Sequence, residues 1–222
     1  SLVYPISPGE PAALHEALSS LTTLENNTLY RMLPSTPTLD FPKEQLKQVS
    51  IFLSGADRKD FNTHKVDLLP NHFSDIPSLL LQRDSAPVIM ATVSPMDKEG
   101  YFSLGTSVSY VGPLLKHAKK IILEVNENMP YTYGDSNHIH VSDVDALIEN
   151  NCDLTTLPEP KLSDKDLAIG EIIADMVPDK ATLQIGFGSM PNAVMKYLMT
   201  KKDLGLHTEM LPDKAVDLYE NN

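Results

Sequence analysis

Short apolar runs that alternate with helical patterns are the feature that most constrains the fold of this 222-residue chain. Helical spacing of apolar residues follows Pro11, begins near Ile76 and follows Pro113. Strands separated by helices usually pair in parallel, and a parallel sheet needs helices on both faces. The sequence therefore predicts an α/β fold with an open, mostly parallel sheet flanked by helices. The runs predicted as strands lie at residues 2–6, 28–33, 49–53, 65–69, 87–93 and 121–125.

Three local patterns sharpen this prediction. The helix after Pro11 is expected to reach Leu21, because leucines and alanines recur on one face to that point. The helix after Pro113 is expected to reach Lys120. The polar segment 97–100 ends in glycine and is typical of a hairpin turn into a strand at 101–104.

A segment without periodicity divides the chain. Residues 154–162 carry two prolines and are predicted to be a linker, and Ser163 is a good cap for a helix that follows it. The expected organisation is one α/β domain over residues 1–153, the linker at 154–162 and a further unit over 163–222.

A glycine turn near the C-terminus is the first candidate binding site. A strand predicted at 181–185 passes through Gly186 and Gly188 into a helix after Pro191 and Asn192. Glycines let a ligand approach the main chain, and free N–H groups at a helix start favour an anion. A purely steric turn is the alternative. The third glycine of a dinucleotide fingerprint and the lysine of a P-loop are missing, so neither a dinucleotide cofactor nor ATP is favoured.

Composition limits the partners. The formal charge of -12, from 18 basic and 30 acidic residues, argues against nucleic acid and against an anionic membrane surface. No apolar run approaches the roughly 20 residues that cross a bilayer, and no secretion signal begins the sequence. We expect a cytoplasmic protein, although a lost targeting peptide stays open if the N-terminus is truncated. The single Cys152 has no predicted role.

The histidines do not predict a metal site. His138 and His140 alternate on one face of a predicted strand with Asp143 nearby, and a structural role is favoured over zinc binding. No Gly-x-Ser-x-Gly elbow is present, which disfavours a serine hydrolase.

Several short motifs, in order, resemble the acetyl-CoA hydrolase/transferase family, closest in pattern to the 4-hydroxybutyrate CoA-transferase type. The resemblance covers nearly the whole chain, and the ordered set is far more specific than any one motif. The motifs are Gly9-Glu-Pro11, Phe73-Ser-Asp-Ile-Pro77, Ser94-Pro95, Gly100-Tyr-Phe-Ser-Leu-Gly105, Glu124-Val-Asn-Glu-Asn-Met-Pro130, Gly134-Asp135, His140-Val-Ser-Asp143, Gln184–Val194 and Asp203-Leu-Gly-Leu-His-Thr-Glu-Met210.

This resemblance implies a CoA-transferase-like fold and a reaction centred elsewhere. Family members are about twice as long, and their nucleophile is a glutamate in the C-terminal half. The resemblance therefore implies no catalytic residue and no metal in this chain, and it makes residues 163–222 the truncated start of the second half. The sequence departs from the family at Leu211-Pro-Asp-Lys214, where Ser-Asp-Gly is typical, which puts the activity of the parent protein in question.

The resemblance also implies site residues. Gly9, Glu10 and Pro11 are expected at the mouth of the substrate site, after the first strand. Asn126, Met129 and Pro130 follow another strand and are expected to line the acyl pocket, with a simple turn as an equal alternative. Gly186, Gly188, Pro191 and Asn192 are expected to hold an acyl oxygen or part of coenzyme A. Glu10 and Glu209 are carboxylates beside motifs, yet the family's glutamate belongs to a different motif.

Two hypotheses follow. The first is the N-terminal half of a CoA-transferase or acyl-CoA hydrolase, with acyl-CoA and a small carboxylate as substrates and with a homodimer or a missing C-terminal half as assembly partner. The second is a non-catalytic acyl-CoA-binding or assembly module. A sugar-phosphate isomerase of related architecture is weaker, because no cluster of basic residues meets the glycine turn.

Overall fold

The computed structural model describes residues 1–221. Two compact units divide the chain between Thr156 and Leu157, inside the proline-containing segment 154–162. The assignment of residues 163–222 to the start of a second CoA-transferase half stays a prediction.

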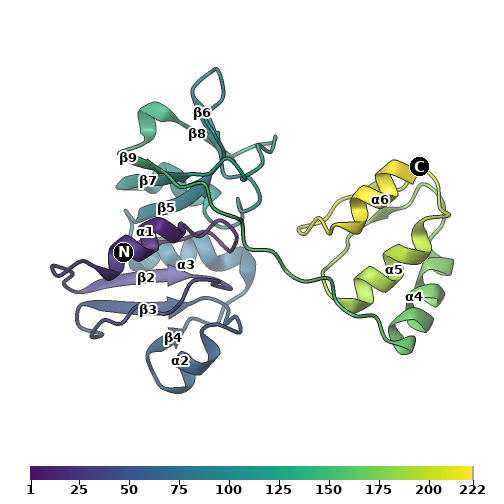
Figure 1. Cartoon of the computed structure of the whole chain (residues 1–222), viewed down its shortest axis with the longest axis horizontal. Coiled ribbons are helices and arrows are strands. Elements are labelled where there is room, and N and C mark those ends of the chain that lie inside the picture. Colours follow the sequence, from purple (N-terminus) through teal and green to yellow (C-terminus); the bar gives the residue numbers. More distant parts are fainter. Residues whose placement is uncertain (222) are drawn as a thin grey trace. The chain divides into compact units, whose positions relative to one another are not determined.

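The first unit is built on a seven-stranded sheet in the order β4-β3-β2-β1-β5-β7-β9 (Figure 1). All neighbouring pairs in it are parallel, which confirms the predicted open parallel α/β fold. From β1 the chain proceeds outward to β4 and then returns to β5 on the other side of β1, so the strand order reverses between β1 and β5. The strands are β1 (Leu2–Val3), β2 (Asn27–Arg31), β3 (Leu46–Ser50), β4 (Val66–Leu68), β5 (Val88–Val93), β7 (Lys120–Val125) and β9 (Ala146–Glu149).

Helices cover both faces of this sheet. On one face, Leu18 of α1 (Ala12–Ser19) packs in a cluster with Leu29 and Met90. On the other, Ile76 and Leu80 of α3 (Ile76–Arg83) belong to the largest apolar cluster of the unit. The remaining helical segments are α2 (Arg58–Asn62) and the 3-10 turns η1 (Phe73–Asp75), η2 (Gly112–His117) and η3 (Val141–Asp143).

A small antiparallel sheet lies outside the main one. It pairs β6 (Tyr101–Ser103) with β8 (His138–His140). The expected turn at 97–100 is present, with Tyr101 N donating to Asp97 Oδ1 at 2.8 Å. However, β6 forms its ladder with β8 and not with β5, so the turn does not join two strands of one simple hairpin.

Three predicted boundaries were wrong. The first helix ends at Ser19, and Leu21 is exposed beyond it. Lys120 already begins β7, so only the 3-10 turn η2 follows Pro113. The strand expected at 49–53 lies at Leu46–Ser50, because the polar Gln48 is buried by hydrogen bonds to both Leu39 N and Leu39 O.

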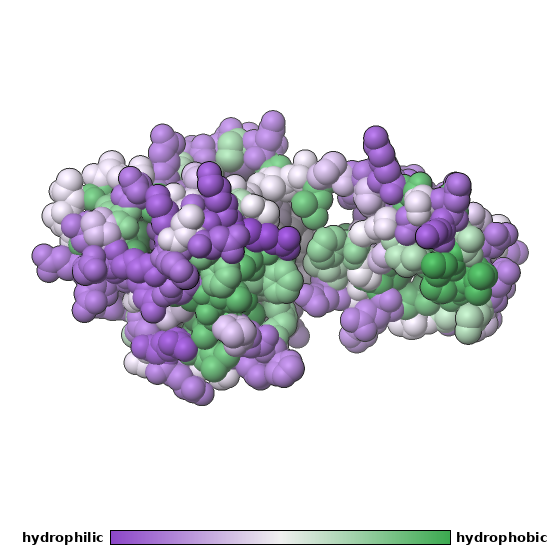
Figure 2. Space-filling model, turned by 90° about the horizontal axis from the view of Figure 1, so that it is seen from below, coloured by the Kyte–Doolittle hydropathy of each residue, from purple (hydrophilic) through white to green (hydrophobic). Residues whose placement is uncertain are grey.

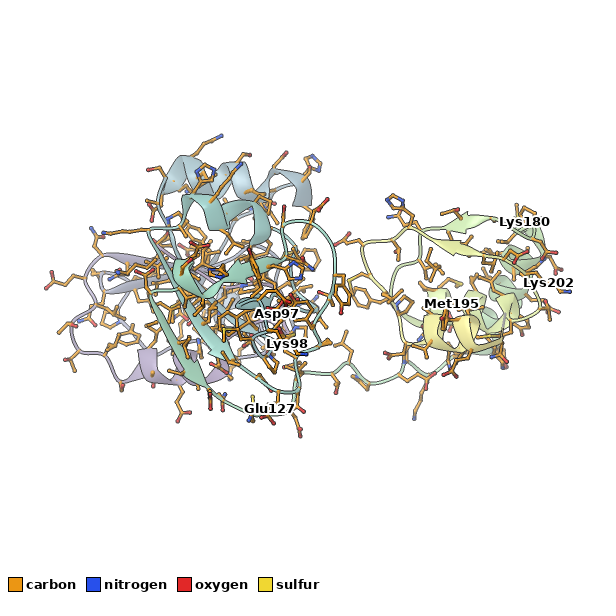
Figure 3. The ribbon with its side chains drawn as sticks, turned by 90° about the horizontal axis from the view of Figure 1, so that it is seen from above. Asp97, Lys98, Glu127, Lys180, Met195 and Lys202 are labelled. Atoms are coloured by element: carbon orange, nitrogen blue, oxygen red, sulfur yellow. The ribbon has the colours of Figure 1, made fainter. Side chains whose placement is uncertain are left out.

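The second unit has three helices and a two-stranded parallel sheet. Ser163 caps the first helix, as the sequence predicted, and Asp166 completes a capping box with it. The core includes Ala174, Leu198 and Met195, which is labelled in Figure 3. The strand expected at 181–185 is only two residues long. The elements are α4 (Asp164–Met176), β10 (Thr182–Leu183), α5 (Ser189–Leu198), β11 (Gly205–Leu206) and α6 (Lys214–Asn221).

One face of α4 is left uncovered in this unit. Four large apolar side chains at helical spacing are exposed there, namely Ile169, Ile172, Ile173 and Met176. The space-filling view in Figure 2 shows apolar (green) surface on this unit.

Candidate functional site

The first unit places its polar loops at the carboxyl edge of the sheet. Open α/β sheets bind ligands in the crevice at this edge, where the strand order reverses. The reversal between β1 and β5 lies beside the segment that contains Gly9, Glu10 and Pro11. The segment expected at the mouth of the substrate site therefore lies beside the switch point of the fold, and its contact with a substrate stays a prediction.

Gly9 is locked against its surroundings. Its N–H donates to Ile6 O at 2.9 Å and to Ser107 Oγ at 3.1 Å, and its carbonyl accepts from Thr92 N at 2.9 Å. A Cβ at this position would lie 2.5 Å from Ser107 Cβ, so no side chain fits without a shift. Glycine is required here by close approach.

Glu10 is a buried carboxylate that binds backbone. Its Oε2 accepts from Ser35 N at 2.7 Å, from Ser35 Oγ at 3.0 Å and from Thr36 N at 3.1 Å. Its own carbonyl accepts from Thr92 Oγ1 at 2.8 Å. The side chain therefore fastens the loop after β2, and it is not presented as a nucleophile.

Arg31 and His15 hold the same loop from the other side. The fully buried Arg31 guanidinium donates to Thr36 O at 3.2 Å and to Pro37 O at 3.1 Å. His15 Nε2 lies 2.9 Å from Pro37 O, so the neutral ring donates there. Burial, with a further contribution from Arg31, lowers the pKa of His15 from 6.5 to about 4. Burial also lowers the pKa of Arg31.

The loop that these side chains hold begins with a strained residue. Leu33 has φ of +46°, a left-handed conformation that costs a residue with a side chain about 1–2 kcal/mol. Its N–H donates to Phe52 O at 2.9 Å. Because the Glu10, Arg31 and His15 contacts lie in the following segment, we infer that they help to hold this conformation.

Glu124 links β7 to the start of α1. Its Oε2 accepts from Ala13 N at 2.9 Å and from Leu14 N at 3.1 Å, and its Oε1 accepts from Asn150 Nδ2 at 2.7 Å. This carboxylate fixes the helix that directly follows the Gly9–Pro11 segment.

The Asn126 loop is tied together internally. Asn126 is fully buried, its Nδ2 donates to Cys152 O at 2.9 Å, and its Oδ1 accepts from Asn128 N at 2.9 Å. Met129 is also buried, whereas Pro130 is exposed. Both ends of the Asn126 amide serve the loop, which agrees better with the turn alternative than with a ligand contact. A role in an acyl pocket stays a prediction.

A second polar group lies at the turn before β6. Tyr131 Oη donates to Asp97 Oδ2 at 2.6 Å, and this hydrogen bond raises the pKa of Tyr131 to about 12 and lowers that of Asp97. The ring of Tyr131 stacks on His138 with 5.1 Å between centroids. Asp97 is labelled in Figure 3 beside Lys98.

The glycine turn of the second unit has only part of the expected geometry. Gly188 has φ of +123°, which favours glycine, but an added Cβ at Gly186 would meet nothing closer than Pro191 Cγ at 3.9 Å. Asn192 N donates to Gly188 O at 3.2 Å, and Pro191 has no N–H. Ser189 and Met190 therefore remain as the N–H donors of the first turn of α5. The side chain of Ser189 already donates to Asp166 Oδ1 at 3.2 Å.

Sequence reasoning missed Arg31, His15 and Glu124 as organisers of this edge. A signal was present for two of them: Arg31 ends one strand and Glu124 interrupts the apolar run of another. A charged residue in a buried strand needs partners, and the position in sequence could have indicated a structural role.

The described part of the chain holds no group of three or more His, Cys, Asp or Glu side chains that could bind a metal ion. Within residues 1–221, no helix has the length and apolar character needed to cross a membrane.

Polar loops at the switch point of an open parallel sheet are typical of α/β domains that bind ligands at this edge. The chain belongs to the acetyl-CoA hydrolase/transferase family, because the model of that family's N-terminal domain matches residues 11–158.

Known relatives agree with this assignment. The chain is 40% identical over 223 residues to the succinyl-CoA:cyclohexane-1-carboxylate CoA transferase of Geobacter metallireducens, across 98% of this chain and 50% of that protein. It is 38% identical over 224 residues to the 4-hydroxybutyrate coenzyme A transferase of Clostridium kluyveri, across 99% and 52%. The crystal structure of RipA from Yersinia pestis superposes with a TM-score of 0.87 at 32% identity, across 100% and 55%. The chain thus spans about half the length of the relatives it matches.

Proposed function

We propose that the chain is the N-terminal portion of an enzyme that moves CoA between an acyl-CoA thioester and a small carboxylate of the acetate, butyrate or 4-hydroxybutyrate type. The observation that carries the proposal is the family match over residues 11–158, which begins at the last residue of the Gly9-Glu-Pro11 motif beside the switch point of the sheet. CoA enters as substrate, and the proposal requires no metal. A cytoplasmic location fits such a reaction.

The proposed chemistry uses a glutamate outside this chain. Its carboxylate attacks the thioester carbonyl, which releases CoA thiolate and leaves an enzyme-bound acyl anhydride. The thiolate then attacks the glutamyl carbonyl, which frees the acyl carboxylate and forms the enzyme-CoA thioester. The second substrate carboxylate then attacks the enzyme-CoA thioester, which releases CoA thiolate and forms a new anhydride. The thiolate attacks the acyl carbonyl of this anhydride, so that the new acyl-CoA leaves and the glutamate carboxylate is restored.

Each unit would contribute residues that bind substrate. In the first unit, Gly9, Glu10 and Pro11 would position the loop after β1. In the second unit, the donors of the Gly186–Asn192 turn would be available to an acyl oxygen or to part of CoA. The carboxylate of Asp166 lies beside that turn and would repel a fully anionic group. The turn is therefore better suited to a carbonyl oxygen than to a phosphate. The second unit would begin the other half of the enzyme.

Isothermal titration of the chain with coenzyme A and acetyl-CoA tests the proposal, together with a transferase assay of the full-length gene product with acetate and butyrate as acceptors. Binding by the chain, and turnover only by the longer product, are expected. Binding by the chain with an inactive longer product would favour a non-catalytic acyl-CoA-binding module. Absence of both would contradict the CoA assignment.

A matched pair of glycine variants sharpens the test. Gly9→Val brings side-chain atoms against Ser107, whereas an added Cβ at Gly55 meets nothing within 4 Å. In the full-length product, Gly9→Val is expected to lower turnover while Gly55→Val leaves it unchanged. Equal activity in the two variants would remove the Gly9 segment from the site.

A further inference from the structure

A hollow lies in the first unit over strands β2, β3 and β4, with a volume of about 780 Å³. Tyr30 and Val49, both largely buried, contribute apolar surface to its lining, and so does Phe61 of α2. The volume lies within the range of about 300–1,000 Å³ that is typical of sites for small molecules, and the lining combines polar and apolar surface. Figure 2 shows the molecule from the side of β4 and α2, and apolar surface there lies between hydrophilic margins.

The hollow is distinct from the Gly9–Pro11 segment. Thr28 and Lys47, which line it, are the second residues of β2 and β3. Arg83, also in the lining, ends α3 shortly before β5 begins. From these amino-end positions the lining follows the strands to Leu69 and Pro70, directly after β4, and neither the Gly9–Pro11 loop nor Arg31 contributes to it.

The rim carries an excess of positive charge. Among the described residues, Asp67 is the one carboxylate that lines the hollow. Its Oδ1 accepts from Lys43 Nζ at 2.8 Å, and its Oδ2 lies 3.1 Å from Lys47 Nζ. The Lys43 hydrogen bond, aided by Lys47, lowers the pKa of Asp67, so this carboxylate is already neutralised by two ammonium groups. Arg83 is exposed and has no ion pair within residues 1–221. In a chain of charge -12, such a group of cations is unusual.

We propose that this hollow is a second ligand site, for a small organic anion that joins a carboxylate or a phosphate monoester to a flat apolar body. The body lies on Tyr30, Val49 and Phe61, and the anionic group binds Arg83 with Lys47 beside it. A guanidinium fork suits both headgroups, because each offers two oxygens in one plane. The proposal is independent of CoA transfer.

Titration with benzoate and with phenyl phosphate tests the site, with benzyl alcohol as the neutral match. At least one anion is expected to bind the wild-type chain at millimolar concentration, and benzyl alcohol more weakly. Arg83→Gln is expected to weaken anion binding about tenfold, the loss typical of a charge-assisted hydrogen bond. Arg58→Gln is the control, since Arg58 is exposed on α2 and lies outside the lining.

Two-dimensional NMR of the same titrations locates the ligand. The expected shifts concentrate on β2, β3 and the end of α3, and a Phe61→Ala variant is expected to weaken both anions. Three results would overturn the proposal: no binding by either anion, equal binding of the neutral match, or an Arg83→Gln variant that binds like wild type. A stronger response to one anion would support the site and identify its preferred headgroup.

Discussion

The two units of the chain each contain a parallel sheet, and they differ in how completely apolar and charged side chains are buried around it. The first has a seven-stranded sheet with helices on both faces, and it buries even charged side chains such as Arg31 and Glu124 by giving them backbone partners. The second has two strands of two residues each, and its α4 leaves Ile172 64% and Met176 78% exposed. Internal polar contacts therefore contribute to the stability of the first unit, whereas the exposed face of α4 contributes little to that of the second.

The largest effect is expected from a test of the buried His15 in the first unit. Its folded-state pKa of about 4 lies below the ordinary 6.5, because burial penalises the charged ring. The unfolded chain then takes up a proton as pH falls from 6.5 to 4 and the folded chain does not. Since the unfolded state binds more protons in this window, the free energy of unfolding decreases as the pH is lowered from 6.5 to 4, by about 3 kcal/mol at most.

Urea unfolding followed by circular dichroism between pH 7 and 4 measures this fall. A His15→Gln variant is expected to lose the His15 share of the pH dependence, while His64→Gln, at an exposed position, keeps it. If both variants follow the wild-type curve, the His15 ring does not stay neutral in the folded unit.

A medium effect is expected from the Glu10 carboxylate. Glu10→Gln keeps the shape but removes the charge that accepts from Ser35 and Thr36, so the free energy of unfolding is expected to drop by about 1.5 kcal/mol. Hydrogen exchange should show the loss of protection at residues 35 and 36. Glu16→Gln, exposed on α1, is expected to change stability by less than about 0.5 kcal/mol. Equal effects of the two variants would mean that Glu10 does not hold the loop.

The smallest effect is expected in the second unit. Ile172→Ser replaces a side chain that is already 64% exposed, so the isolated chain is expected to change in stability by less than about 0.5 kcal/mol. Denaturant unfolding and sedimentation at several concentrations measure this. A loss above about 1 kcal/mol would show that the α4 face is covered in solution and would weaken the contrast between the units.

The parallel α/β arrangement could be predicted because it depends on local patterns. Residues 87–93 are apolar apart from Thr92, as is typical of buried parallel strands, and Ser163 lies directly before the helix that it caps. The boundary of β3 was missed because it depends on a contact outside the strand. Gln48 is polar and would be expected at the surface, but it is buried because its side chain hydrogen bonds to the N–H and the carbonyl of Leu39.

The polar contacts at the carboxyl edge depend on distant residues and were not predictable in the same way. Glu124 binds the N–H groups of Ala13 and Leu14, more than 100 positions away, and no spacing in the sequence encodes that pairing. The segment 9–11 follows β1, as expected, but the strand ends already at Val3, and the ligand-facing role of the segment stays a prediction. Of the two glycines expected to shape the turn at 186–191, only Gly188 has a positive φ.

The position of Glu124 has a consequence for coenzyme A. A helix start beside a switch point is normally where an α/β protein receives phosphate, because its unpaired N–H groups carry partial positive charge. At α1 two of these groups already serve an internal carboxylate. The protein thus places its own carboxylate there, and under the proposed function the phosphates of CoA would need donors elsewhere.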